Sequence, residues 1–188
     1  METFEGAPVV HAETTEQWRD WLAGHHTDAK QAWLVLSKGG AVSYDDAVCQ
    51  ALCFGWIDSV SKPRDETTRY QRFGPRNPAS TWVRSNRDRV QRLTDSGEMA
   101  PAGLALVEAA KASGVWDLLA DVEEGIVPDD VRAALDAVPD AAATFDAFPA
   151  GVRKAILMWI VSAKRPATRE ARIATTVEKA ARGERSGP

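Results

Sequence analysis

Residues 53–74 read CFGWIDSVSKPRDETTRYQRFG, and this stretch decides the architecture of the N-terminal half. Gly55 comes just after a helical pattern, and glycine at that position is typical of a helix end, because it readily adopts the left-handed conformation. Two segments with strand character follow, residues 56–61 and 69–74, on either side of a polar segment. This pattern predicts an antiparallel β-hairpin.

Upstream of the hairpin, the sequence predicts two helices and one strand. Thr14 and Ser43 each stand where an N-cap is expected, three residues before a side chain that completes a capping box. The apolar residues 32–37 predict a buried strand. Beyond Pro78 the apolar spacing is helical. We therefore predict an α+β fold, in which a small antiparallel sheet within residues 8–75 packs on helices and precedes a mostly helical C-terminal half.

Charge is distributed in blocks along the chain. The formal net charge of −4 combines residues 1–59 at −6, 60–92 at +6, 93–150 at −10 and 151–188 at +6. Two basic blocks in an acidic protein favour internal complementarity or a local anion site over general binding of polyanions. The acidic residues 117–130 include Pro128 and are the expected boundary between lobes. This predicts an α+β lobe at 1–116 and a helical lobe at 117–188, which could pack as one compact domain.

The composition predicts a cytoplasmic protein without membrane insertion. No apolar run approaches the roughly 18–20 residues that a membrane span requires. The N-terminal residues lack the basic start and apolar core of a signal peptide. Cys49 and Cys53 are the only cysteines, and their helical spacing is poor for a mutual disulfide. A reducing compartment fits these features.

Two kinds of catalytic or cofactor site receive little support from the sequence. No metal site is predicted, because no pair of cysteines or histidines repeats a metal-binding spacing, and no cofactor motif is present. A Cys–His nucleophile built on Cys53 is disfavoured, because Cys53 lies at the C-terminal end of its helix, where the helix dipole opposes a thiolate.

Asp58 is the first candidate site residue. In a regular strand Trp56, Asp58 and Val60 share one face. A carboxylate between large apolar residues must be solvated or paired. The partner strand offers Arg69 and Arg72, and Arg76 follows shortly after. We weigh two interpretations, a structural Asp–Arg bridge and a polar wall of a pocket in which Asp58 orients a ligand or acts as a base.

The loop and helix after the hairpin supply the second candidate group. Arg76, Ser80, Trp82 and Asn86 combine charge, a hydrogen-bonding hydroxyl, an aromatic ring and an amide. Such a set suits a planar or anionic group, and aromatic residues between arginines also suit single-stranded nucleic acid. The negative net charge and the lack of a familiar nucleic-acid module argue against the latter. Trp82 could instead anchor the loop to the core.

Several long segments resemble the YdeI/OmpD-associated, or bacteriocin-protection, family of bacterial proteins. The similarity runs from about Trp33 to Arg182. It is carried by SYDDAVCQALCFGWIDS, RYQRFGPRNPASTW, RVQRL, GEMAPAGL and WIVSAKRPATREARI. The resemblance implies a cytoplasmic protein linked to stress or antibiotic resistance, and it implies no reaction.

The resemblance also indicates which positions recur in the family. These are Trp56, Asp58, Arg72, Arg76, Ser80, Trp82 and Asn86. Cys49 stands where the family usually has an acid, and Val83 where it usually has a serine, so the ligand of this chain could differ from that of its relatives.

Together these observations predict a protein that binds a small anionic or planar ligand. The predicted ligand-binding residues are Trp56, Asp58, Arg69, Arg72, Arg76, Ser80, Trp82 and Asn86. Two alternatives stay open, an enzyme that uses Asp58 or Cys53 in the same pocket and a nucleic-acid-associated factor.

Overall fold

The computed structural model describes residues 2–187, which divide into two compact units. The first unit comprises the chain up to Ser80 together with Ser85–Ser113. The second comprises Thr81–Arg84 and the chain from Gly114 onward. The short segment Thr81–Arg84 therefore belongs to the second unit, although the segment that directly follows it belongs to the first.

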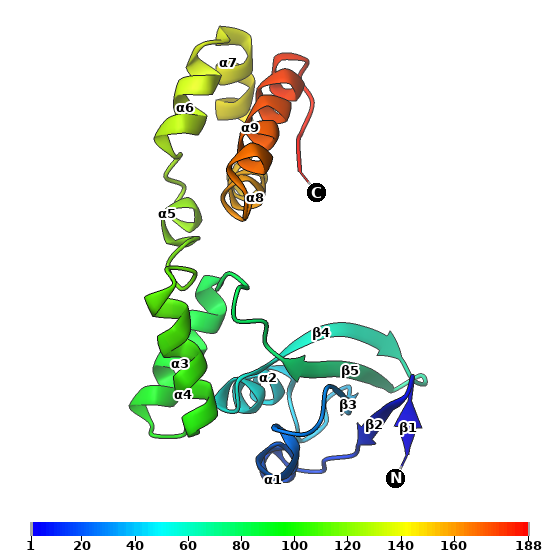
Figure 1. The fold of residues 1–188 in the computed structure, drawn as a ribbon. Coiled ribbons are helices and arrows are strands. Elements are labelled where there is room, and N and C mark those ends of the chain that lie inside the picture. Colours follow the sequence, from blue (N-terminus) through cyan, green and yellow to red (C-terminus); the bar gives the residue numbers. More distant parts are fainter. Residues whose placement is uncertain (1, 188) are drawn as a thin grey trace. The chain divides into compact units, whose positions relative to one another are not determined.

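A sheet forms the centre of the first unit (Figure 1). Its strands are β1 (Thr3–Phe4), β2 (Ala7–Val10), β3 (Ala32–Ser37), β4 (Trp56–Pro63) and β5 (Thr68–Pro75). They lie in the order β1-β2-β3-β5-β4. The hairpin of β4 and β5 confirms the prediction from residues 53–74. The antiparallel prediction is wrong for one pair, since β2 and β3 run parallel. A helix crosses over between these two strands, and such a connection allows parallel pairing.

Helices α1 (Thr15–His25) and α2 (Tyr44–Cys53) pack on one face of this sheet (Figure 1). Trp18 of α1 is fully buried, and its ring centroid lies 5.2 Å from that of Phe73 in β5. The indole Nε1 of Trp18 donates a hydrogen bond of 3.0 Å to the carbonyl oxygen of Ala47 in α2. One side chain therefore joins both helices to the sheet.

The local signals that delimit these helices act as predicted. The Thr14 hydroxyl accepts a hydrogen bond of 3.3 Å from the Gln17 amide. Ser43 accepts one of 3.0 Å from the Asp46 amide. At the end of α2, Gly55 has a φ of 75°, so a side chain there would strain the backbone. The chain can therefore turn from α2 directly into β4.

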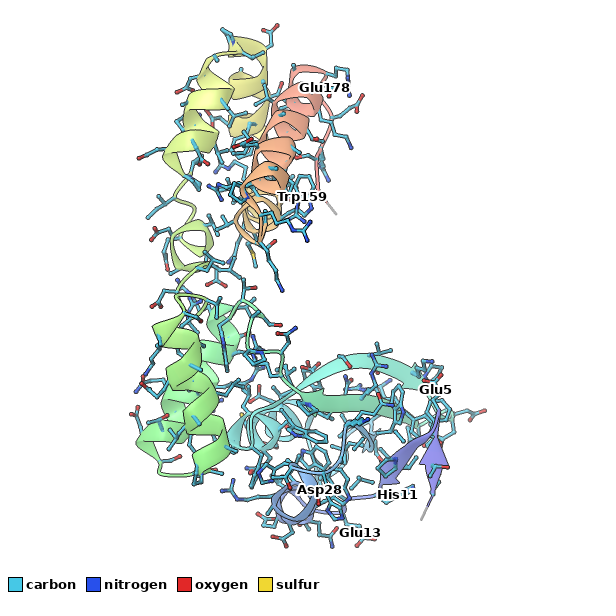
Figure 2. All side chains as sticks on the ribbon, viewed as in Figure 1. Glu5, His11, Glu13, Asp28, Trp159 and Glu178 are labelled. Atoms are coloured by element: carbon cyan, nitrogen blue, oxygen red, sulfur yellow. The ribbon has the colours of Figure 1, made fainter. Side chains whose placement is uncertain are left out.

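The opposite face of the sheet carries a second, smaller cluster, which we call the aromatic face. It consists of the rings of Phe4, Trp33 and Tyr70 and the cations of Lys62, Arg64 and Arg72. Phe4 stacks on Tyr70 with centroids 4.3 Å apart. Glu5, in the turn between β1 and β2, pairs with Lys62 of β4 (Figure 2). The two edge strands are thus tied together across this face.

Two further helices complete the first unit, α3 (Arg84–Asp95), apart from its first residue, and α4 (Pro101–Ala112). Pro101 occupies the first turn of α4, as predicted. Gly103 of α4 lies against the end of α2 so closely that a Cβ atom at this position would stand 2.6 Å from the Leu52 carbonyl oxygen. The absence of a side chain at Gly103 therefore sets the approach of the two helices.

The second unit is helical, as predicted. Its helices are α5 (Ala120–Glu123), α6 (Asp129–Asp136), α7 (Pro139–Ala147), α8 (Ala150–Val161) and α9 (Pro166–Ala181). Phe145 is fully buried in its core. Arg169 of α9 pairs with Asp130 of α6 at 2.7 Å, and the Arg172 guanidinium lies 4.9 Å from the ring centroid of Trp159, which Figure 2 labels. The first contact joins two helices that are distant in sequence, and the second joins the consecutive helices α8 and α9.

Candidate ligand-binding site

An irregularity in β4 decides which side chains share a face of the hairpin. Asp58 lies opposite Phe73, whereas Ser61 lies opposite Gln71, so β4 holds one residue more than β5 between these pairs. Such a β-bulge interrupts the alternation of faces. Ser61 therefore joins the face of Asp58, and Val60, which the regular pattern placed there, falls within the bulge and is 38% exposed.

The bulge borders a pocket of about 430 Å³, which we call the Asp58 pocket. It is lined by Tyr44, Asp58, Ser59, Ser61, Arg69 and Gln71. Tyr44 comes from the first turn of α2, and the other residues come from β4 and β5. Its volume is within the range of small-molecule sites, and it is a shallow depression that is open to solvent. Of the predicted residues, Asp58 and Arg69 line this pocket.

The Asp58 carboxylate is held by the phenol of Tyr44. The Tyr44 hydroxyl donates a hydrogen bond of 2.7 Å to Oδ2 of Asp58. Burial, together with this hydrogen bond and the charge of Asp58, raises the pKa of Tyr44 to about 12. Tyr44 is therefore a neutral donor at physiological pH. Oδ2 of Asp58 is therefore held by a hydrogen bond from a neutral phenol and not by an ion pair.

The negative charge of Asp58 also acts on the buried guanidinium of Arg76. The Arg76 side chain is 7% exposed, and its backbone amide donates to the Gly55 carbonyl oxygen at 2.9 Å. Burial lowers the pKa of Arg76 to about 10, and the negative charge of Asp58 opposes that shift. Asp58 thus stabilises a buried guanidinium, and the predicted Asp–Arg attraction involves Arg76.

Arg72 does not lie beside Asp58. It pairs with Trp33 across β3 and β5, and its guanidinium lies 5.7 Å from the centroid of that ring, on the aromatic face. Its Nε donates a hydrogen bond of 2.9 Å to the Ser59 hydroxyl. Successive strand residues point to opposite faces, so Arg72 and Phe73 cannot both face the helices. Arg69 and Arg72 consequently belong to different surfaces of one strand.

The remaining predicted residues lie outside the Asp58 pocket. Trp56 is 1% exposed and donates from Nε1 to the His26 carbonyl oxygen at 3.1 Å, so it is a core residue. Ser80 closes a turn through its amide, which donates to Asn77. Trp82 belongs to the second unit, where its ring lies 4.9 Å from that of Trp116. Asn86 accepts a hydrogen bond of 2.8 Å from Arg89.

Four residues of the Asp58 pocket were not predicted from the sequence: Tyr44, Ser59, Ser61 and Gln71. The sequence did contain a signal for Gln71, because it is a polar residue that alternates with Phe73 on the core-facing side of a strand. A buried polar side chain requires a hydrogen-bond partner, and Gln71 is 4% exposed. Tyr44 follows the N-cap Ser43 and is 41% exposed, and no sequence signal marks it. Its partner Asp58 could not be identified from sequence spacing.

The cysteines and histidines form no catalytic pair within residues 2–187. Cys53 is fully buried, and burial raises the pKa of its thiol. The ring nitrogens of His25 and His26 contact backbone carbonyl oxygens of α1, and His11 contacts Glu2 at 2.6 Å. None of the three histidines hydrogen-bonds Cys53.

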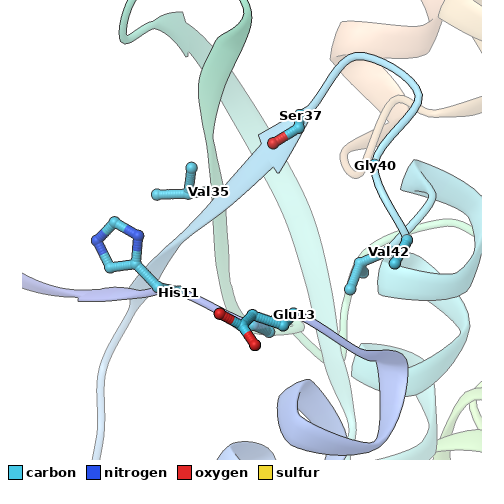
Figure 3. Close-up of a pocket in the computed structure, with 8 residues that line it drawn as sticks. His11, Glu13, Val35, Ser37, Gly40 and Val42 are labelled. Carbon is cyan, nitrogen blue, oxygen red and sulfur yellow. The ribbon is translucent and has the colours of Figure 1, made fainter.

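A second pocket in the first unit, of about 260 Å³, lies beside the end of β2 (Figure 3). His11 and Glu13 lie along one side of it, and Val35, Ser37 and Val42 along the other. Both His11 and Glu13 are exposed. None of the residues predicted from the sequence lines this pocket.

The contact between Tyr44 and Asp58 can be tested spectroscopically. In the Asp58→Asn variant, the pKa of Tyr44 is expected to fall from about 12 towards the ordinary value near 10, because the anionic acceptor is removed while burial persists. Alkaline titration of ¹³C-labelled tyrosine by NMR measures this, with Tyr44→Phe providing the assignment. An unchanged titration curve would show that Asp58 does not hold the phenol.

Comparison with known proteins identifies two regions of the chain. Residues 10–106 match the family described as "Domain of unknown function (DUF8412)". Residues 124–183 match the family described as "Bacteriocin-protection, YdeI or OmpD-Associated", which confirms the resemblance for the segment WIVSAKRPATREARI, whereas the other four segments that carried it lie within the first match. The Asp58 pocket lies within the first match, and helices of the second unit lie within the second. No curated protein and no solved structure matches the chain. Within residues 2–187, every helix is too short or too polar to cross a membrane.

Proposed function

We propose a function from the residues of the Asp58 pocket, because the chain belongs to a family described only as a domain of unknown function, and its residues 124–183 match the bacteriocin-protection, YdeI or OmpD-associated family. The protein binds a small molecule with an anionic or planar group in the Asp58 pocket. Binding of this kind serves stress, antibiotic or bacteriocin resistance by sequestering the molecule in the cytoplasm. The family description supports the link to protection, and the two free cysteines suit a reducing compartment.

The observation that carries this proposal is that Arg69 lines the pocket without an ion-pair partner among the described residues. Its guanidinium forms no ion pair with any other residue of the described chain, although it lines the pocket. It lies 5.9 Å from the ring centroid of Tyr44, which orients it. A guanidinium presents a fork of donors that matches a carboxylate or phosphate in a bidentate manner. The adjacent Tyr44 ring offers a surface for a planar group.

Arg69 and Arg72 provide a matched pair of variants, since they are three residues apart on one strand and face different surfaces. Arg69→Ala is expected to weaken the binding of small carboxylates and phosphates at least tenfold, whereas Arg72→Ala removes only a hydrogen bond to Ser59 at the pocket and weakens binding much less. Native mass spectrometry of freshly purified protein, followed by calorimetry with acetate, benzoate and phosphate, measures the effect. Equal losses in both variants would place the anion site elsewhere.

The aromatic face favours a second candidate, binding of single-stranded nucleic acid. Rings beside cations are the groups on which bases stack and near which phosphates lie. In that case the same variants give the opposite result, because Arg72→Ala weakens the binding of an oligonucleotide and Arg69→Ala does not. Such binding would also fall steeply with salt concentration. Phe4 already stacks on Tyr70, and Glu5 already pairs with Lys62, so the small-ligand proposal has the stronger support.

An enzyme in the same pocket is the third possibility considered. Burial of Cys53 removes it as a nucleophile, because an inaccessible thiol with a raised pKa does not react readily. Asp58 lines the pocket and would be the base of such an enzyme. Its contacts with Tyr44 and Arg76 equally explain it as an orienting group, so binding is the simpler function.

A further inference from the structure

The Asp58 pocket contains charges of both signs, and this narrows the class of ligand that it accepts. We propose that the ligand is a small zwitterion in which an ammonium group binds at Asp58 and Gln71 while a carboxylate or phosphate binds at Arg69. Amino acids and aminoalkyl phosphates have this chemistry. The inference rests on the proposed function and adds the second charge and its position.

The first step concerns Asp58. Its Oδ2 accepts the hydrogen bond from Tyr44, and the Gln71 amide nitrogen lies 3.5 Å from the same oxygen. The other oxygen, Oδ1, accepts no hydrogen bond from any residue of the described chain. An ionised carboxylate can only accept. A purely anionic ligand would therefore meet a like charge, whereas an ammonium group would supply the missing donors.

The second step concerns Gln71, which is 4% exposed. Its amide nitrogen is directed to Asp58 and to the Val60 carbonyl oxygen, at 3.5 and 3.4 Å. Its amide oxygen is consequently the end left to accept from a ligand. The bulge places Ser61 opposite Gln71, which adds a hydroxyl to the same part of the pocket. An ammonium group has three donors, and these residues provide three acceptors.

The third step concerns the distance between the two charged ends. The Arg69 guanidinium lies 5.9 Å from the ring centroid of Tyr44, and the hydroxyl of the same ring lies 2.7 Å from Oδ2 of Asp58, so both charges border one phenol. A hydrogen bond at each end spans about 3 Å between heavy atoms. A molecule with only a few bonds between its ammonium and its anion therefore suits the pocket. Tyr44 links both ends, since its hydroxyl donates to Asp58 and its ring lies by Arg69.

The test compares probes that carry one or both charges. Glycine, β-alanine and phosphoethanolamine are the zwitterions, acetate and phosphate the anions, and methylamine the cation. Binding is followed by NMR shifts of the Tyr44 ring and the Arg69 side chain, and affinities are measured by calorimetry. At least one zwitterion is expected to bind tenfold more tightly than any single-charge probe.

Two variants test the ammonium site at Asp58 and the anion site at Arg69 separately. Asp58→Asn is expected to abolish the preference for the zwitterion while anions still bind, and Arg69→Gln is expected to remove binding of zwitterions and anions alike. Arg69 is exposed, so its variant should fold, and Arg64→Gln, which changes an exposed cation of the aromatic face, is the matched control with unchanged binding. If anions bind the native protein as tightly as zwitterions, the inference is wrong and the proposed function stands. If no probe moves the Tyr44 or Arg69 signals, both are wrong.

Discussion

Replacing Trp18 with alanine is expected to lower the free energy of unfolding of the first unit by about 3–5 kcal/mol. The indole is fully buried between α1, α2 and the sheet, so its removal leaves a cavity that the surrounding residues cannot fill completely. It also leaves the Ala47 carbonyl oxygen without its donor. Urea unfolding, with hydrogen exchange of α1 and α2 as the local readout, measures the loss.

Two variants calibrate this loss. Trp18→Phe keeps a six-membered ring but removes the donor together with the pyrrole part of the indole, which is expected to cost about 1–3 kcal/mol. Trp21→Ala removes a partly buried ring that stacks on Trp18 at 5.4 Å, and a smaller loss is expected than for Trp18→Ala. If Trp21→Ala were the more damaging of the two alanine variants, the core of this unit would be centred elsewhere.

Replacing Gly103 with alanine is expected to destabilise the first unit by about 1–3 kcal/mol, as overpacking does in other cores. The new Cβ atom would meet the carbonyl oxygens of Leu52 and Cys53 well inside contact distance, and these backbone atoms cannot rotate away. Helix α4 must therefore shift away from the end of α2. The midpoint of thermal unfolding should fall accordingly.

Gly24 is the control for this substitution. It also lies within a helix of the first unit, and a Cβ atom at this position meets nothing within 4 Å. Gly24→Ala is expected to stabilise the protein by about 0.5–1 kcal/mol, because alanine has the higher helix propensity. A similar outcome for both variants would mean that the contact at Gly103 yields easily.

The sequence predicted those parts of the fold that depend on local signals. Thr14 and Ser43 cap their helices, Gly55 ends α2, and the hairpin follows. These features depend on backbone groups within a few residues, and short patterns encode them. The parallel pairing of β2 with β3 depends on distant contacts, and no local pattern reports those.

The candidate site was predicted less completely, for two physical reasons. The predicted group followed the chain from Trp56 to Asn86, whereas the Asp58 pocket draws Tyr44 from a helix that precedes the hairpin. A bulge also shifted the faces of β4, and Ser59 and Val60 give no warning of it, because no glycine marks the position. Asp58 and Arg69 were found because a charge beside apolar strand residues needs a partner.

The bulge also affects how related sequences should be compared with this one. Removing a single residue between Asp58 and Ser61 would restore a regular ladder, with Ser61 still opposite Gln71 and one residue opposite Arg72. A relative shorter by one residue here would keep Asp58, Ser61 and Gln71 on one face but would have one residue fewer at the edge of the pocket. Segment length at this point should therefore be compared together with residue identity when relatives are aligned with this chain.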